Sequence, residues 1–152
     1  MNPVNIMETG ENMVIMTKEQ YDSIVAHAQK HAPLEACGLL GGIWEGEKKT
    51  VKKVYFLTNI DQSAEHFSLK PEEQFAAVKD MRESGWSLLG NFHSHPATPS
   101  RPSEEDKRLA FDTKASYLIL SLAGEEPVLN SFKIDSEKNV TKEELIIEEA
   151  SL

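Results

Sequence analysis

The sequence has little cysteine and no long hydrophobic run. Its single cysteine, Cys37, excludes an internal disulfide and a zinc site built from several thiolates. The most apolar stretch, residues 36–44, is rich in glycine and too short to cross a bilayer. Residues 1–16 lack the basic and apolar regions of a secretory signal, so we expect no such signal. A chain poor in thiols suits a reducing compartment, and we expect the protein in the cytoplasm.

The sequence also lacks a basic excess. Lysine and arginine number 16 against 25 acidic residues, which gives a formal net charge of -9. An acidic surface is poorly matched to the phosphates of nucleic acids and to anionic lipid headgroups. We therefore expect neither a nucleic-acid partner nor a membrane partner, and the oligomeric state is open.

The length and the hydrophobic content of 39% suit one domain with a substantial core. We expect residues 1–16 to form a loose leader and residues 17–152 to form a single domain. Apolar periodicity, capping signals and prolines predict helices over residues 17–32, 71–84 and 103–111. Strands are expected over residues 36–44, 51–58, 66–69, 86–93, 117–122, 128–134 and 145–148.

Strands and helices are interspersed along the chain, which predicts an α/β protein whose sheet carries helices on its faces. Several strands are separated by connections too short for a parallel crossover, and these favour antiparallel pairs. The sequence therefore predicts a mixed sheet rather than an all-parallel one.

The most informative segment is His93-Ser94-His95-Pro96, which is followed by Ser103 and Asp106. Side chains two residues apart on a strand face the same way, so both imidazoles can point at one spot while Ser94 points away. Asp106 falls in the first turn of the next predicted helix, from which its carboxylate can reach the imidazoles. Two imidazoles and one carboxylate with a position left for water describe a catalytic zinc site.

Each part of this pattern also has an ordinary interpretation. Ser103 and Asp106 are a normal helix cap, with a hydroxyl at the N-cap and an acid three residues later. A His-x-His pair by itself is more often incidental than a metal site. Only the joint pattern favours zinc.

Two residues upstream have a role only if the zinc site is real. Glu35 by itself is a solvated acid at the start of a strand, but a carboxylate beside zinc-bound water, whose pKa is lowered to about 7, can take its proton. Cys37 is either a nucleophile, which would need a positioned histidine base, or a buried apolar residue. We favour the buried interpretation of Cys37.

Taken together, these residues resemble the signature of the JAMM (MPN-type) metalloprotease family. That signature is an upstream glutamate, then His-Ser/Thr-His-Pro, six residues, a serine, two residues and an aspartate. Glu35, residues 93–96, Ser103 and Asp106 match it with the spacing intact. Residues 33–42 are also similar to the glutamate-bearing segment of compact prokaryotic members, and the resemblance covers roughly residues 17–135.

The resemblance implies a three-layer sandwich in which a curved mixed sheet is flanked by helices, as in cytidine deaminases. It implies a zinc peptidase that cleaves the amide bond after the C-terminal Gly-Gly of a ubiquitin-like or sulfur-carrier protein. His93, His95 and Asp106 would hold one zinc ion per chain, Glu35 would act as general base, and Ser103 would stabilise the oxyanion. The extended tail of the substrate would add as a strand at an edge of the sheet.

Two other functions are weighed against this one. A non-catalytic interaction module of the MPN type would have a broken ligand set, whereas this set is whole. A non-haem iron oxygenase also uses two histidines and a carboxylate, but the ligand order and the serine at its fixed offset argue against it. Analysis of the bound metal separates all three hypotheses.

Overall fold

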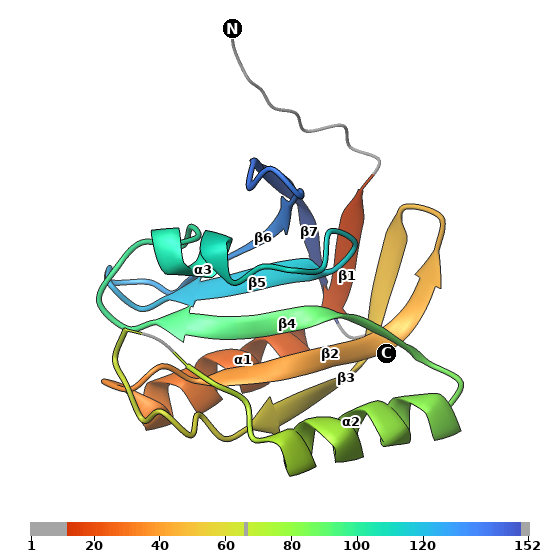
Figure 1. The fold of residues 1–152 in the computed structure, drawn as a ribbon, viewed down its shortest axis with the longest axis horizontal. Helices are drawn as coiled ribbons and strands as arrows, with labels where there is room; N and C mark the ends of the chain where they lie inside the picture. Colours follow the sequence, from red (N-terminus) through yellow and green to blue (C-terminus); the bar gives the residue numbers. More distant parts are fainter. Residues whose placement is uncertain (1–11, 66, 150–152) are drawn as a thin grey trace, which may run out of the picture.

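The computed structural model describes residues 12–65 and 67–149, and within them it places seven strands and three helices. Figure 1 shows the elements in chain order. They are β1 (Met13–Thr17), α1 (Lys18–His31), β2 (Cys37–Glu45), β3 (Lys48–Leu57), α2 (Pro71–Glu83), β4 (Ser87–His95), α3 (Glu104–Arg108), β5 (Ser116–Ser121), β6 (Val128–Ile134) and β7 (Val140–Glu148).

The strands form one sheet in the order β1-β3-β2-β4-β5-β6-β7, and the sheet closes into a barrel. Strand β1 is parallel to both of its neighbours, β3 and β7, and β4 is parallel to β5. The other neighbouring pairs are antiparallel. The predicted α/β class with a mixed sheet is confirmed.

The prediction of a loose leader over residues 1–16 is wrong for its last part. Met13–Thr17 form β1, whose alternate residues Val14 and Met16 are each 1% exposed and face the core. Residues 1–11 lie outside the described residues. Because β1 pairs with β3 on one side and with β7 on the other, it closes the ring, and the sheet is a barrel rather than the middle layer of the predicted sandwich.

Two shorter predictions also differ from the structure. In place of a strand at residues 66–69 there is one isolated antiparallel bridge between Asn59 and Leu69, and residue 66 lies outside the described residues. The Ser68 N–H bonds to the side chain of Asn59, which keeps this segment in a loop. The third helix ends at Arg108 rather than at Phe111, whose side chain is 82% exposed and has no core to pack against.

Helices α1 and α2 have the starts that the sequence predicts. Thr17 and Gln20 cap α1 reciprocally, each side chain accepting a hydrogen bond from the backbone N–H of the other. Pro71 opens α2, where its missing N–H costs no hydrogen bond. Among the described residues, no helix is long and apolar enough to span a membrane.

The glycines of β2 and β4 allow the strands to pack closely. A Cβ on Gly38 would lie 2.1 Å from the Tyr55 carbonyl oxygen, and one on Gly90 would lie 2.0 Å from the Ser116 carbonyl oxygen. Both positions are therefore restricted to glycine, which explains why an apolar strand such as β2 is rich in glycine.

Lys49 is buried among these strands, with 3% of its surface exposed. Its Nζ donates to the Leu89 carbonyl at 3.0 Å, the Lys114 carbonyl at 2.7 Å and the Ser116 hydroxyl at 2.8 Å. The ammonium also lies 4.1 Å from the centre of the Trp44 ring. Burial, together with the charge of Lys133, lowers the pKa of Lys49 to about 8. This side chain connects β3 to β4 and to the start of β5.

Lys49→Met removes the only donor that these three contacts share. We expect the free energy of unfolding to fall by about 1–3 kcal/mol, because the buried Leu89 carbonyl and Ser116 hydroxyl lose this donor, whereas the Lys114 carbonyl keeps a hydrogen bond from Lys133. Urea denaturation followed by circular dichroism measures the change. The matched control is Lys52→Met, an exposed position on the same strand, which should change stability by less than about 0.5 kcal/mol. Equal effects of the two substitutions would contradict a structural role for Lys49.

Candidate metal centre

Strand β4 carries both histidines of the motif at its C-terminal end. His93 and His95 are 3% and 5% exposed, and β4 is paired there with neighbours on both sides. Cys37 of β2 lies opposite His93, and Ser121 of β5 lies opposite His95. The sheet therefore holds the backbone of the two histidines in place.

The proline-containing loop after β4 is fastened to the neighbouring strands. The Ser121 hydroxyl donates to the Thr98 carbonyl at 2.6 Å, and the Ser100 hydroxyl donates to the Ile119 carbonyl at 2.6 Å. Asn130 on β6 adds a hydrogen bond of 3.1 Å to the Ser100 hydroxyl. These contacts return the chain toward β4 (Figure 1), so that Asp106 of α3 reaches both histidines.

Three potential ligand atoms meet at this point. The Nε2 atoms of His93 and His95 are 3.1 Å apart, and they lie 3.1 and 3.2 Å from Oδ2 of Asp106. A tetrahedral zinc ion with ligands at about 2.0–2.2 Å separates its ligand atoms by about 3.4 Å. The three side chains that the sequence nominated are thus brought together, at a spacing that fits one small metal ion.

The protonation of His95 is set by a backbone group. Its Nδ1 donates to the Pro99 carbonyl at 2.9 Å, which leaves the lone pair of Nε2 facing Asp106 and His93. Metal-binding histidines are commonly oriented by such a contact at the other ring nitrogen. Pro99 has no part in the site predicted from the sequence, and no pattern in the sequence marks a carbonyl for this role.

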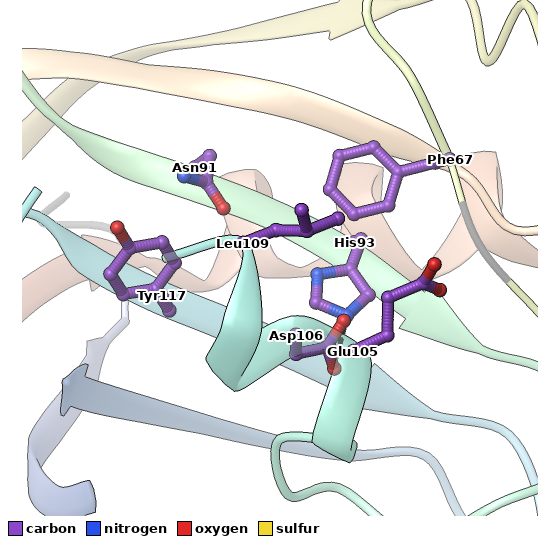
Figure 2. Close-up of a pocket in the computed structure, with 7 residues that line it drawn as sticks. All are labelled: Phe67, Asn91, His93, Glu105, Asp106, Leu109 and Tyr117. Atoms are coloured by element: carbon purple, nitrogen blue, oxygen red, sulfur yellow. Dashed lines mark hydrogen bonds and ion pairs between the residues drawn. The ribbon is translucent and has the colours of Figure 1, made fainter. Parts of the chain in front are cut away.

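Phe67 is a second residue that sequence reasoning missed. Its ring stacks on the His93 ring with centroids 4.8 Å apart and planes inclined by 29°. The loop that carries Phe67 comes from the other side of β4 than α3 does, and Figure 2 shows the ring beside His93. Sequence reasoning gave Phe67 only a place in a short strand.

The helix cap expected at Ser103 and Asp106 is present, and it leaves the Asp106 carboxylate beside the histidines. The Ser103 hydroxyl accepts from the Asp106 N–H at 3.0 Å, and Asp106 Oδ2 accepts from the Ser103 N–H at 2.9 Å. The same carboxylate oxygen also faces the two imidazoles. Burial by itself would raise the pKa of Asp106, but its hydrogen bonds with His93 and His95 hold that pKa far below its ordinary value.

Glu35 is buried rather than solvated, with 4% of its surface exposed. Among the residues that the structure describes, its Oε1 atom has no hydrogen-bond partner. Burial raises its pKa to about 8, and the nearby His95 opposes the shift. A buried carboxyl with an unpaired oxygen is costly to keep, so the interpretation of Glu35 as an ordinary surface acid is wrong.

Ser94 holds the segment that carries Glu35. Its hydroxyl accepts from the Ala36 N–H at 2.8 Å, and its own N–H donates to the Ala36 carbonyl at 2.9 Å. Cys37, the next residue, is fully buried, and burial raises the pKa of its thiol to about 12. A thiol with that pKa is not a nucleophile near neutral pH, in agreement with its interpretation as a core residue.

A cavity of about 230 Å³ opens beside His93. Phe67 lies at one end, Asn91 and His93 line its floor along β4, and Leu109 and Tyr117 lie toward α3 and β5 (Figure 2). Asp106 also lines the cavity, so a ligand there would touch two of the three grouped side chains directly, His93 and Asp106.

Residues 17–135 match the family described as prokaryotic homologs of the JAB domain. The chain belongs to this family. This JAB-family protein is 30% identical to the CysO-cysteine peptidase of Mycobacterium tuberculosis over 109 residues, which cover 72% of the chain and 73% of the relative. It is 29% identical to the Desampylase of Pyrococcus furiosus over 135 residues, which cover 89% of the chain and 91% of the relative.

A solved structure shows the same fold for this JAB-family protein. The solution structure of a protein from Desulfitobacterium hafniense is 57% identical, covers 91% of this chain and 94% of its own, and superposes with a TM-score of 0.84. The resemblance to compact prokaryotic JAMM proteins is confirmed by the family match. The names of the relatives, a peptidase and a desampylase, support a hydrolase.

Ser94→Ala tests whether this buried serine holds the Glu35 segment. The variant leaves the Ala36 N–H without its acceptor, so we expect the free energy of unfolding to fall by about 1–3 kcal/mol. Urea denaturation gives the value, with Ser87→Ala at the exposed start of β4 as control. A stability equal to that of the control would show that the Ser94 hydroxyl does not support this segment.

Proposed function

We propose that the protein is a zinc-dependent peptidase that cleaves the amide bond after the C-terminal Gly-Gly of a ubiquitin-like or sulfur-carrier protein. The observation that carries the proposal is the convergence of three ligand atoms next to a buried carboxyl with an unpaired oxygen. The names of the two relatives, a CysO-cysteine peptidase and a desampylase, support the substrate class.

In this proposal His93, His95 and Asp106 hold one zinc ion per chain. Their spacing fits a tetrahedral ion, and the contact of His95 with the Pro99 carbonyl leaves Nε2 free to bind it. When bound, zinc supplies a Lewis acid for the carbonyl oxygen and lowers the pKa of water. The remaining steps fall to the side chains around it.

Glu35 acts as general base and then as general acid. It takes a proton from the attacking water and returns it to the departing amine. Its burial suits this role, because a carboxyl whose pKa is raised toward neutrality both accepts and releases a proton readily.

Ser103 stabilises the negative charge that develops on the carbonyl oxygen. Its hydroxyl oxygen is occupied by the Asp106 N–H, which leaves the hydroxyl hydrogen free to donate to substrate. One such donor contributes about 3–4 kcal/mol to lowering the barrier in a characterised hydrolase.

The cavity beside His93 receives the tail of the carrier. The expected strand addition has no edge available next to the histidines, because β2 and β5 occupy the two sides of β4 there. The tail is instead held by side chains such as Asn91 and Tyr117 and by the loop that carries Phe67. A tail that ends in glycines is slender enough to reach the ligands along this path.

Glu35→Gln is the direct test of the mechanism. The wild-type protein is incubated with a CysO–cysteine adduct, and release of cysteine is followed by the intact mass of the carrier. We expect the variant to lose about 10²–10⁴-fold in rate, because the proton transfer is lost, while it retains zinc. Absence of cleavage of this and other carrier adducts by the wild type would overturn the proposed function. Loss of zinc from the variant would contradict a purely catalytic role for Glu35.

His95→Ala separates binding of the metal from folding. We expect the variant to lose its zinc but to keep a folded barrel, because the apolar core of the barrel does not include the ligands. Elemental analysis and circular dichroism measure the two properties on protein purified without added metal. An unfolded variant would mean that the metal is structural.

Metal analysis of the wild-type protein also separates the rival functions. Iron in the wild type would favour the oxygenase hypothesis, and no metal would favour the interaction module.

A further inference from the structure

The loop between β3 and α2, described over residues 58–65 and 67–70, is organised around the side chain of Asn59. Its Oδ1 accepts from the Asp61 N–H at 3.0 Å and from the Ser68 N–H at 3.2 Å. Its Nδ2 donates to the Glu35 carbonyl at 3.1 Å. Because two backbone N–H groups point at one atom of the amide, that atom is the oxygen, and the NH₂ group faces Glu35.

The same loop also binds the other backbone polar group of Glu35. The Glu35 N–H donates to the Ser63 carbonyl at 2.8 Å. Strand β2 begins only at Cys37, and the contacts with Ser94 begin at Ala36. The backbone of Glu35 is therefore bonded on both sides to residues of the loop rather than to the sheet.

We propose that Asn59 is a positioning residue for Glu35, and this inference rests on the peptidase function proposed above. Asn59 holds the Glu35 carbonyl, and through Ser68 it also orders the backbone next to Phe67. The Phe67 ring covers His93. The Asn59 amide thereby fixes the position of Glu35 relative to the Phe67 ring, which covers the proposed zinc ligand His93.

The proposal explains why residue 59 is an asparagine rather than an aspartate. Aspartate in the same rotamer accepts from the Asp61 and Ser68 N–H groups as asparagine does, but it places a second acceptor against the Glu35 carbonyl. Asn59→Asp therefore keeps the order of the loop and removes the contact with Glu35. Asn59→Ala removes both functions.

Steady-state kinetics on the CysO–cysteine adduct give the first readout. We expect Asn59→Asp to lower kcat about fivefold to tenfold, which corresponds to one lost hydrogen bond, with KM within about twofold of the wild type. Zinc content is unchanged. The matched control is Thr58→Val, which removes a 2.8 Å hydrogen bond from the Thr58 hydroxyl to Glu73 at the start of the same loop and should leave kcat unchanged. A wild-type kcat in Asn59→Asp, or an equal loss in the control, would overturn the proposal.

Amide hydrogen exchange followed by NMR gives a second readout that needs no substrate. In Asn59→Asp the loss of the contact at the Glu35 carbonyl lets this segment open more often, so we expect the Glu35 N–H, which donates to the Ser63 carbonyl, to exchange about tenfold faster than in the wild type, while the Ser68 amide stays protected. If Asn59→Asp does not fold, the exchange rate of the Glu35 amide is measured in Asn59→Ala instead, and faster exchange there supports the proposal. Unchanged exchange at Glu35 would overturn the role of Asn59. Failure of the wild type to cleave any carrier adduct would instead overturn the peptidase function and leave the exchange result valid.

Discussion

The antiparallel pairing of β2 with β4 is the constraint on which the site depends. Its register sets Cys37 opposite His93, and Ala36 and Ser94 exchange hydrogen bonds beyond the last pair. Glu35 thus arrives beside histidines that lie far along the sequence. A slip of two residues would preserve the inward and outward faces of both strands but move Glu35 by about 7 Å relative to the histidines. Gly38 and Gly90, which tolerate no side chain, help to exclude such a slip.

Stability and chemistry use the same atoms at the start of α3. A carboxylate three residues after an N-cap serine is favourable in any helix, because it accepts a backbone N–H and lies at the positive end of the helix dipole. Here that carboxylate, Asp106, also faces the two imidazoles. A helix of only five residues would have little stability by itself, and its contacts with β4 explain why it is formed at this place.

The sequence predicts well those features whose partners are close together along the chain. The cap at Thr17 and Gln20, the bounds of β6 and the grouping of His93, His95 and Asp106 all follow from patterns that span at most 13 residues between partners. Strand β1 was not predicted because it is short and because its two partner strands, β3 and β7, are far away in the sequence. The closed ring was missed for the same reason.

The residues around the ligands are hard to predict for a related reason. The roles of Asn59 and Pro99 depend on single hydrogen bonds to groups that no periodicity reveals. Lys49 stands next to exposed lysines on β3, so its burial cannot be read from composition. In each case the deciding fact is which distant segment packs against the residue.

One oxygen of Asp106 contacts the Ser103 N–H and both imidazole nitrogens. Because α3 is short, Asp106 and Leu109, the residue that ends the helix, both line the cavity. Under the proposed function, an ion bound by this carboxylate would pull on the same turn that forms a wall of the cavity. Metal occupancy and the shape of the cavity would then be linked, so that loss of the ion would change selectivity as well as rate.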